Sequence, residues 1–249
     1  MFISKYSASG NDFVIFHTFK EIDRSALAKK LCHRFNGIGA DGLITLLPSN
    51  EADFKWQFYN SDGSEAEMCG NGSRAVAHYA LTNGLAESEM KFLTKAGIIT
   101  AKVDGDIVES ELTSPKILKD EFSEEGFNWI LIDTGVPHLV TLVDDLESYN
   151  KEISAKMRYK YNANVNFAKV ENEFLRVRTY ERGVEDETLA CGTGMSACFL
   201  FANQKNLLGS ESKVYPKSNE ELTISLIDKK LFFKGRVKRV FDTCVEHTL

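Results

Sequence analysis

Apolar and polar residues alternate in short runs along most of the chain, and this pattern predicts β-strands. In the first half the runs are Phe2–Ser7, Phe13–His17, Gly42–Leu47, Phe54–Tyr59, Met90–Thr94, Ile98–Val103 and Ile107–Leu112. In the second half they are Ile130–Asp133, Leu139–Val143, Val165–Val170, Phe174–Tyr180, Leu222–Ile227 and Leu231–Val237. The chain is therefore expected to be rich in strands.

Helices are predicted at four places, from apolar residues at helical spacing and from start and stop signals. They run from an N-cap at Asp23 to about Phe35, over Gly70–Asn83, between about Leu146 and Tyr159, and over Gly192–Asn206. Strands mixed with helices in this way predict the α/β (α+β) class.

The order of motifs in the first half recurs in the second half, which indicates an internal duplication. The motif Gly10-Asn11-Asp12-Phe13-Val14 resembles Gly135-Val136-Pro137-His138-Leu139, 125 positions later, and the segment 37–42 has its counterpart at 162–167. Cys69-Gly70-Asn71-Gly72 matches Cys191-Gly192-Thr193-Gly194, 122 positions later. We therefore expect two related units with a boundary near Ser114-Pro115.

The duplication sets the expected domain organisation. The units should comprise residues 1–113 and 114–237, with residues 238–249 packing back on the first unit. Each should be a mixed, largely antiparallel sheet or barrel around a central helix. A pseudo-symmetric pair of this kind is expected to hold its active site in the cleft between the units.

Composition narrows the classes of partner. The 249 residues are 43% hydrophobic and carry a formal net charge of −6, which argues against nucleic acid or a membrane surface as a partner. No apolar run approaches the roughly 20 residues that span a bilayer. The first residues lack an apolar signal segment, so a cytoplasmic location is expected. The five cysteines include no CxxC pair, which disfavours a zinc site, and no metal is expected.

The two Cys-Gly-x-Gly turns carry the candidate chemistry, because each opens a predicted helix. A helix start presents unpaired N–H groups and partial positive charge. These lower the pKa of a nearby thiol and bind a carboxylate. One such turn alone is more often structural, since buried cysteines are common. Two turns at equivalent points of a repeat favour Cys69 and Cys191 as a pair of acid/base groups. Cys198, further along its helix, is better explained by core packing.

Polar residues near the two cysteines suit a zwitterionic substrate. Arg182 can pair with a carboxylate and Glu181 with an ammonium group, while Asn60 and Asn164 are neutral donors and acceptors. Turn chemistry is an alternative for Asn60, and it is the favoured interpretation of Asp62-Gly63. Glu185 and Asp186 fit either the site or a solvated acidic loop.

The chain resembles the diaminopimelate epimerase family over nearly its whole length. The matching stretches are 9–14, 37–42, 58–74, 164–167 and 180–194, and the two cysteine motifs in this order are highly specific. The resemblance implies a cofactor-independent isomerase, with neither metal nor pyridoxal phosphate. It would interconvert LL- and meso-2,6-diaminopimelate for lysine and peptidoglycan precursor synthesis, and it would form a homodimer.

The resemblance also implies roles for single residues. Cys69 and Cys191 would exchange the α-proton as thiolate and thiol. The main chain of Gly70-Asn71 and Gly192-Thr193 would hold the reacting carboxylate. The distal carboxylate and amine would be bound by Asn11, Asn60, Asn164 and Arg182, whereas His138 and Glu181 would tune the thiol pKa values and orient the reacting end.

Two positions depart from the family pattern. Val136 stands where some members have asparagine, and Gly42 stands where some have glutamine, so two substrate contacts are in doubt.

A proline or hydroxyproline racemase is the nearest alternative function, while a PhzF-like isomerase lacks the cysteine pair. A non-catalytic amino-acid-binding protein would not need both thiols. A thiol hydrolase with His138 as its base would leave the second cysteine unexplained.

Overall fold

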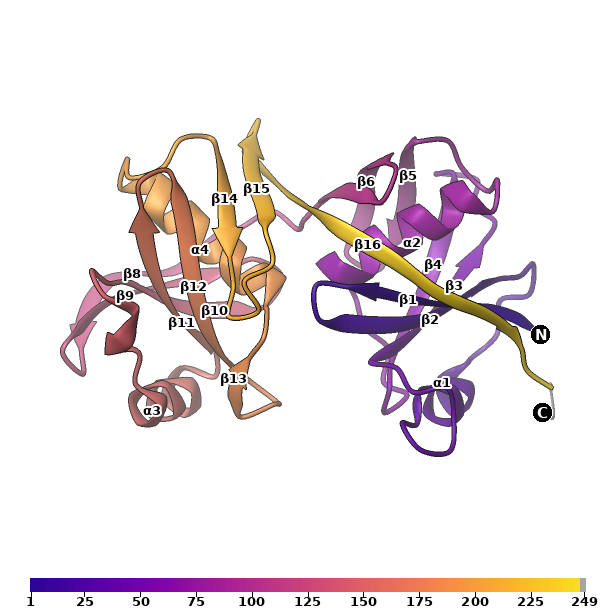
Figure 1. Ribbon diagram of the computed structural model, residues 1–249, viewed down its shortest axis with the longest axis horizontal. Coiled ribbons are helices and arrows are strands. Elements are labelled where there is room, and N and C mark those ends of the chain that lie inside the picture. The colour runs from indigo at the N-terminus through magenta and orange to yellow at the C-terminus, as the bar shows by residue number, and fades with distance from the viewer. Residues whose placement is uncertain (247–249) are drawn as a thin grey trace. The chain divides into compact units, whose positions relative to one another are not determined.

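The computed structural model describes residues 1–246, which divide into two compact units (Figure 1). Unit 1 comprises residues 1–110 together with the chain from Lys234 onward, and unit 2 comprises residues 111–233. The chain thus passes between the units a few residues before the expected boundaries at 113/114 and 237/238. Residues 237–244 pair with the first strand of unit 1, while residues 247–249 of the expected returning segment lie outside the described residues.

Unit 1 is a closed barrel of eight strands. Its strands are β1 (Phe2–Ala8), β2 (Asn11–His17), β3 (Gly42–Leu47), β4 (Phe54–Asn60), β5 (Glu89–Thr94), β6 (Gly97–Asp104), β7 (Ile107–Glu111) and most of β16 (Lys230–Cys244). They neighbour one another in this order, and β16 returns to pair antiparallel with β1. The barrel therefore leaves no edge strand open to unintended pairing.

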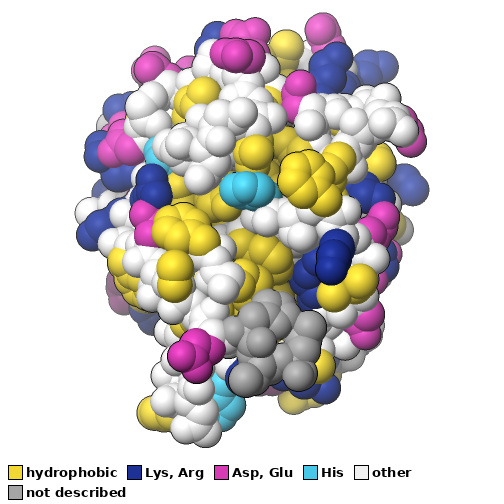
Figure 2. Space-filling view, turned by 90° about the vertical axis from the view of Figure 1, so that its right-hand side faces the viewer, with side chains coloured by type: hydrophobic (Ala, Val, Ile, Leu, Met, Phe, Trp, Pro, Cys, Tyr) yellow, Lys and Arg dark blue, Asp and Glu magenta, His cyan; other side chains and the backbone are white. Residues whose placement is uncertain are grey.

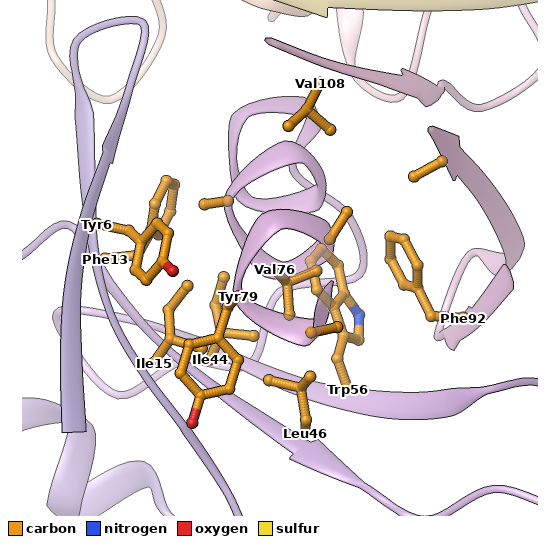
Figure 3. Close-up of a cluster of buried hydrophobic side chains, with 14 of the residues drawn as sticks. Tyr6, Phe13, Ile15, Ile44, Leu46, Trp56, Val76, Tyr79, Phe92 and Val108 are labelled. Carbon is orange, nitrogen blue, oxygen red and sulfur yellow. The ribbon is translucent and has the colours of Figure 1, made fainter. Parts of the chain in front are cut away.

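Helix α2 (Gly70–Thr82) forms the centre of unit 1, because ten of its thirteen residues are buried. Figure 3 shows Val76 and Tyr79 of this helix among apolar side chains from the surrounding strands. Among these, Trp56 and Phe92 bring large rings into the same cluster, with their centroids 5.6 Å apart. Helix α1 (Ser25–Cys32) packs on β3 and β4 over a second, smaller core.

Unit 2 also arranges its strands around a central helix. Its strands are β8 (Lys116–Glu124), β9 (Phe127–Asp133), β10 (Pro137–Leu142), β11 (Asn164–Glu171), β12 (Phe174–Glu181), β13 (Asp186–Thr188), β14 (Glu211–Tyr215), β15 (Leu222–Ile227) and the start of β16. Helix α4 (Gly192–Gln204) is buried against β9–β12, β14 and β15. Helix α3 (Lys151–Tyr161) packs on β10–β13 beside Trp129 and Phe167.

Strand pairing shows the duplication directly. In unit 1, pairs β1–β2, β3–β4 and β5–β6 are antiparallel, whereas β2–β3 and β4–β5 are parallel. In unit 2, pairs β9–β10, β11–β12 and β14–β15 are antiparallel, whereas β10–β11 and β12–β14 are parallel. The sequence of pairings is the same, so the predicted class and the two duplicated, strand-rich units around central helices are confirmed.

Register corrects one correspondence between the halves. Phe13 pairs with Gly42, and its counterpart His138 pairs with Asn164. Gly42 therefore corresponds to Asn164, 122 positions later, and the expected match of segment 37–42 with 162–167 is wrong by three residues. The offset of 122 is the one that also relates Cys69 to Cys191.

Several elements differ from the sequence prediction. Asn150 accepts a hydrogen bond from the N–H of Ile153 and starts α3 afresh, so the helix expected from Leu146 is a 3₁₀ turn (Leu146–Ser148) followed by a separate helix. Helix α1 begins after Arg24, close to the expected start, but it ends at Cys32, before the expected end near Phe35. Three strands, β8, β13 and β14, were not predicted. No described helix is long and apolar enough to cross a membrane.

Candidate functional site

Cys69 is the residue that starts α2. Its backbone is extended, with φ −151° and ψ 117°, and its sulfur accepts a hydrogen bond from the N–H of Gly72 at 3.4 Å. The thiol is partly buried and touches the apolar core of unit 1. The cysteine therefore acts as the N-cap of the central helix, as the turn motif predicts.

Burial changes the expected acidity of this thiol. Burial of the thiol away from water raises the pKa of Cys69 above its ordinary value. The backbone N–H groups of Gly72 and Asn71 lower this pKa, but their effect is smaller than that of burial. Arg74 also lowers it, whereas Asp41 raises it. The prediction that the helix start gives Cys69 a lowered pKa is wrong for this state of the protein, because desolvation outweighs the helix N–H groups.

The amide of Asn71 is held in one orientation beside Cys69. Its oxygen accepts a hydrogen bond from Arg74, a fully buried residue that also donates to Ser9 Oγ at 2.8 Å. Its Nδ2 donates to Asn11 Oδ1 at 2.8 Å. Asn11 donates in turn to Asp41 Oδ2 at 2.9 Å. The structure thus brings Cys69, Asn71 and Asn11 into one hydrogen-bonded cluster.

Asp41 belongs to an ionic cluster that the sequence reasoning missed. Arg34 donates to both carboxylate oxygens of Asp12, at 2.6 and 2.8 Å, and to Asp41 at 2.6 Å. Lys5 also reaches Asp12, at 2.8 Å. Burial alone would raise the pKa of Asp12, but the bonds from Arg34 and Lys5 outweigh it and hold the pKa below 3.8. Asp12 and Asp41 lie within quoted motifs, which was the available signal.

Asn60 ends β4 opposite Gly42 and is exposed. Its Nδ2 donates to Ser64 Oγ at 3.0 Å, so its side chain takes part in the turn that follows the strand. Asp62 accepts from the N–H of Ser64 at 2.8 Å, and Gly63 has φ +82°. The turn interpretation of Asp62-Gly63 is confirmed, and Asn60 makes a turn contact as well.

Cys191 starts α4 from a similar extended backbone, with φ −131° and ψ 107°, but without the side-chain capping bond that Cys69 makes. It is 9% exposed, and its sulfur lies 3.6 Å from the hydroxyl of Thr193. A Cβ at Gly192 would lie 3.0 Å from the ring of Phe233, so the glycine lets the turn pack closely. Both predicted cysteine turns are therefore helix N-caps, one in each unit.

His138 lies beside Thr193 in the interior of unit 2. Its Nε2 is 2.9 Å from Thr193 Oγ1, and its Nδ1 is 3.1 Å from Asn166 Nδ2. The ring is fully buried, and this burial, reinforced by the positive charge of Arg182, lowers the pKa of His138 to about 3. The imidazole is therefore neutral at physiological pH.

A neutral buried histidine predicts a pH-dependent stability. The unfolded chain takes up a proton near pH 6.5, whereas folded His138 resists it until about pH 3. Stability is therefore full above pH 6.5 and falls as the pH decreases toward 3, by up to about 1.4 kcal/mol per pH unit from this group. In urea unfolding between pH 4.5 and 7.5, His138→Gln should lose less stability on acidification than the wild type. Parallel curves would contradict this assignment.

Asn164 and Arg182 come together at the ends of β11 and β12. Asn164 Oδ1 accepts the backbone N–H of Arg182 at 2.7 Å, and its Nδ2 lies 3.4 Å from His138 Nε2. The Arg182 guanidinium donates to the carbonyl of Asn162 at 2.8 Å. Glu181 is the last residue of β12, beside Arg182. Unit 2 therefore gathers Cys191, Thr193 and these residues around one helix start.

The acidic segment after Arg182 leaves Asp186 exposed, but its carboxylates are paired with basic side chains. Glu185 pairs with Arg158 at 2.6 Å, Asp186 with Lys151 at 2.7 Å, and Glu187 accepts bonds from Arg178. Strand β13 then pairs with β12. These ion pairs hold the segment against the sheet, which favours a structural role for the acidic residues.

Gly42, one of the two departures from the family pattern, has a steric reason. A Cβ there would lie 2.4 Å from the ring of Phe58 and 2.9 Å from the carbonyl oxygen of Tyr59. Any larger residue would have to displace this ring or the neighbouring strand. Within residues 1–246, no group of three or more His, Cys, Asp or Glu side chains has the arrangement of a metal site.

Comparison with known proteins identifies the family. The profile of the diaminopimelate epimerase family matches residues 3–118 and 130–240. The chain is 62% identical to the diaminopimelate epimerase of a Nitratiruptor species, covering 99% of both chains. It is 54% identical to that of Campylobacter lari, covering 96% of both. The chain therefore belongs to the diaminopimelate epimerase family and is an isomerase.

Solved structures with little sequence identity share the fold. A probable proline racemase from Agrobacterium radiobacter K84 has a TM-score of 0.75 at 14% identity, covering 98% of this chain and 92% of that one. A PhzF-family protein from Bacillus anthracis has a TM-score of 0.74 at 15% identity, covering 99% of both. Because the identities are low, these likenesses bear on the fold alone.

Proposed function

We propose that this protein interconverts LL-2,6-diaminopimelate and meso-2,6-diaminopimelate by a two-base mechanism. The observation that carries the proposal is the pair of cysteine N-caps at equivalent positions of a duplicated fold, Cys69 on α2 and Cys191 on α4. One thiolate removes the α-proton, and the other thiol protonates the opposite face. The roles exchange in the reverse direction. Sequence identity of 62% to a relative named as this enzyme supports the choice of substrate.

The two helix N-termini supply hydrogen-bond donors that the reaction needs. An α-proton beside a carboxylate is a very weak acid, so negative charge that develops in the transition state needs fixed donors. The N–H groups of Gly70-Asn71 and Gly192-Thr193 are assigned to the reacting carboxylate, as the N-termini of helices suit anions. Exclusion of water strengthens these interactions. His138 and Glu181 are assigned to tuning the thiols.

The other end of the substrate is assigned to Asn11, Asn60, Asn164 and Arg182. Two of these amides are held in fixed orientations: Asn11 by Asn71 and Asp41, and Asn164 by the N–H of Arg182. Fixed amides discriminate by position, because a substrate group that is absent or misplaced leaves a buried donor unpaired. This arrangement favours a diamino diacid over proline.

The proposal is tested by incubating the purified protein with LL-2,6-diaminopimelate without added cofactor and resolving the stereoisomers by chiral chromatography. The expected result is a mixture of LL and meso forms, with no racemisation of proline. Racemisation of proline but not diaminopimelate would support the proline racemase alternative. Binding of diaminopimelate without any isomerisation would indicate a binding protein.

Arg182 should act mainly on substrate binding. In Arg182→Met, the loss of one charge-assisted contact is expected to reduce kcat/KM by about tenfold to a hundredfold, chiefly through a higher KM. Arg176→Met is the matched control, since Arg176 lies on β12, the strand that Arg182 follows, and pairs with Glu171 and Asn219 instead. Steady-state kinetics with diaminopimelate measure both. Equal effects of the two variants would contradict the role of Arg182.

Three further parts of the proposal rest on the family, and two of them are open to simple tests. The product would serve lysine and peptidoglycan synthesis, which complementation of a diaminopimelate-requiring strain would show. The location would be cytoplasmic, and the working form a homodimer. Figure 2 shows hydrophobic side chains exposed near the centre of the face that it draws, and exposed residues of unit 1 include Phe2, Val240 and Phe241. Light scattering should give about twice the mass of one chain.

A further inference from the structure

A chain of four hydrogen bonds ends at the sulfur of Cys191, and its direction is set at Asn166. This fully buried amide donates from Nδ2 to the carbonyl oxygen of Leu139 at 2.9 Å. Its Oδ1 accepts the hydroxyl of Thr179 at 2.9 Å. Because a backbone carbonyl only accepts, the NH₂ group must face Leu139, and the orientation of the amide is settled.

The amide then fixes the tautomer of His138. Asn166 Nδ2 lies 3.1 Å from His138 Nδ1 and presents its second hydrogen there, so Nδ1 is the acceptor. A neutral imidazole has one acceptor nitrogen, and the proton therefore sits on Nε2. The longer 3.4 Å approach of Asn164 Nδ2 to Nε2 is then a contact between two donors. Burial and Arg182 keep the ring neutral by lowering the pKa of His138.

The fixed tautomer directs the hydroxyl of Thr193. His138 Nε2–H donates to Thr193 Oγ1 at 2.9 Å, which occupies the side of the oxygen that faces the ring. The hydroxyl hydrogen of Thr193 therefore points away from the ring. Cys191 Sγ lies 3.6 Å from Thr193 Oγ1 and is in reach of this hydrogen. A hydroxyl hydrogen directed at sulfur favours the thiolate over the thiol.

We propose that Cys191 is the resting thiolate, and that Thr193, oriented through His138 by Asn166 and Thr179, is a positioning residue that stabilises it. The assignment rests on the proposed two-base function and adds which sulfur removes the first proton from the free enzyme. The equivalent position in unit 1 is Asn71, whose amide is engaged by Arg74 and Asn11. Cys69 therefore has no such hydroxyl from its own turn and rests as the thiol.

Other titratable and charged groups in this part of unit 2 lie on β10, on α4 and at the end of β12. Glu181 ends β12 and Arg182 follows it, His138 on β10 is neutral, and Cys198, deeper in α4, is a thiol whose pKa burial raises well above 9. The positive charge of Arg182 acts on His138, whose pKa it lowers. A substitution at Thr193 leaves that charge in place, so its effect isolates the hydroxyl.

The test measures thiolate formation without any substrate. Full-length protein is treated with iodoacetamide at a series of pH values, and alkylation of Cys69 and Cys191 is followed on separate peptides by mass spectrometry. In the wild type, Cys191 should reach half its limiting rate at a lower pH than Cys69. Thr193→Val, which keeps the shape but removes the hydroxyl, should slow Cys191 alkylation about tenfold at pH 7. Thr193→Ser should restore it.

The limiting rate at high pH separates acidity from access, because it reports how easily the reagent reaches the sulfur. It should be similar in Thr193→Val and Thr193→Ser. Nitrogen-15 shifts of His138 should show the proton on Nε2. A midpoint for Cys191 that is unchanged in Thr193→Val, or a proton found on Nδ1, would overturn the proposal. Neither readout uses diaminopimelate, so failure of the epimerase assay would leave this result interpretable on its own.

Discussion

Replacing either Cys69 or Cys191 by alanine is expected to lower kcat for diaminopimelate isomerisation by about a thousandfold or more. General acid/base groups contribute typically about 10²–10⁴-fold each, and inversion without a second base has no donor on the opposite face. The two single variants should be similarly impaired, because each cysteine serves as base in one direction and as acid in the other. Initial rates measured from both the LL and the meso side give the result.

The control for these variants is Cys244→Ala, since Cys244 is exposed near the end of β16 and has no assigned role. It should retain the activity of the wild type. Circular dichroism of all three variants separates lost chemistry from lost fold. Turnover within about tenfold of the wild type in either Cys69→Ala or Cys191→Ala would contradict the two-base account.

Gly194→Ala is expected to damage both stability and turnover. A Cβ at this position would lie 2.4 Å from Asn166 Oδ1 and 3.3 Å from the His138 ring. Both neighbours are fully buried, and Asn166 is already fixed by Leu139 and Thr179. Overpacking of this kind typically costs about 1–3 kcal/mol. Turnover should fall by about tenfold or more, because displacement of His138 also disturbs Thr193 beside Cys191.

Two glycines provide matched controls for this variant. Gly72 is the equivalent position in unit 1, and a Cβ there would meet Ile44 at 3.3 Å, a contact that a small shift relieves. Gly209 has open space around it. Unfolding in urea and steady-state kinetics should rank the damage as Gly194→Ala, then Gly72→Ala, then Gly209→Ala. A Gly194→Ala protein as stable and active as Gly209→Ala would contradict the packing described for the start of α4.

Local signals in the sequence were sufficient for the elements that carry the cysteines. The Cys-Gly-x-Gly turns predicted the first residues of α2 and α4, and the alternating runs predicted Gly42–Leu47 and Leu222–Ile227 with the observed bounds. Strand β8 escaped because most of its residues are exposed, so its sequence lacks the alternation that marks a half-buried strand. Its place in the fold comes from pairing with β9.

The supporting residues of the site were beyond local reasoning. Arg74 bonds to Ser9 across 65 positions of sequence, and His138 meets Thr193 across 55. Such partners depend on strand register and on the seating of the central helices, which periodicity does not specify. Asn166 lies in the matching stretch 164–167 but was given no role, and Thr179 gave no signal, because a buried asparagine or threonine in a strand resembles any polar residue on a solvated face. The acidity of Cys69 was also missed, since burial is a tertiary property.

The most direct test of the two-base account is isomerisation of LL-2,6-diaminopimelate in D₂O, stopped after a small fraction has reacted. The account predicts that the meso product carries deuterium at the inverted α-carbon, while the recovered LL substrate carries little. The reason is that one sulfur takes the proton and the other, already exchanged with solvent, delivers a deuteron. Meso product that retains its original proton at that carbon would contradict the account, because it would mean that a single base returns the same proton.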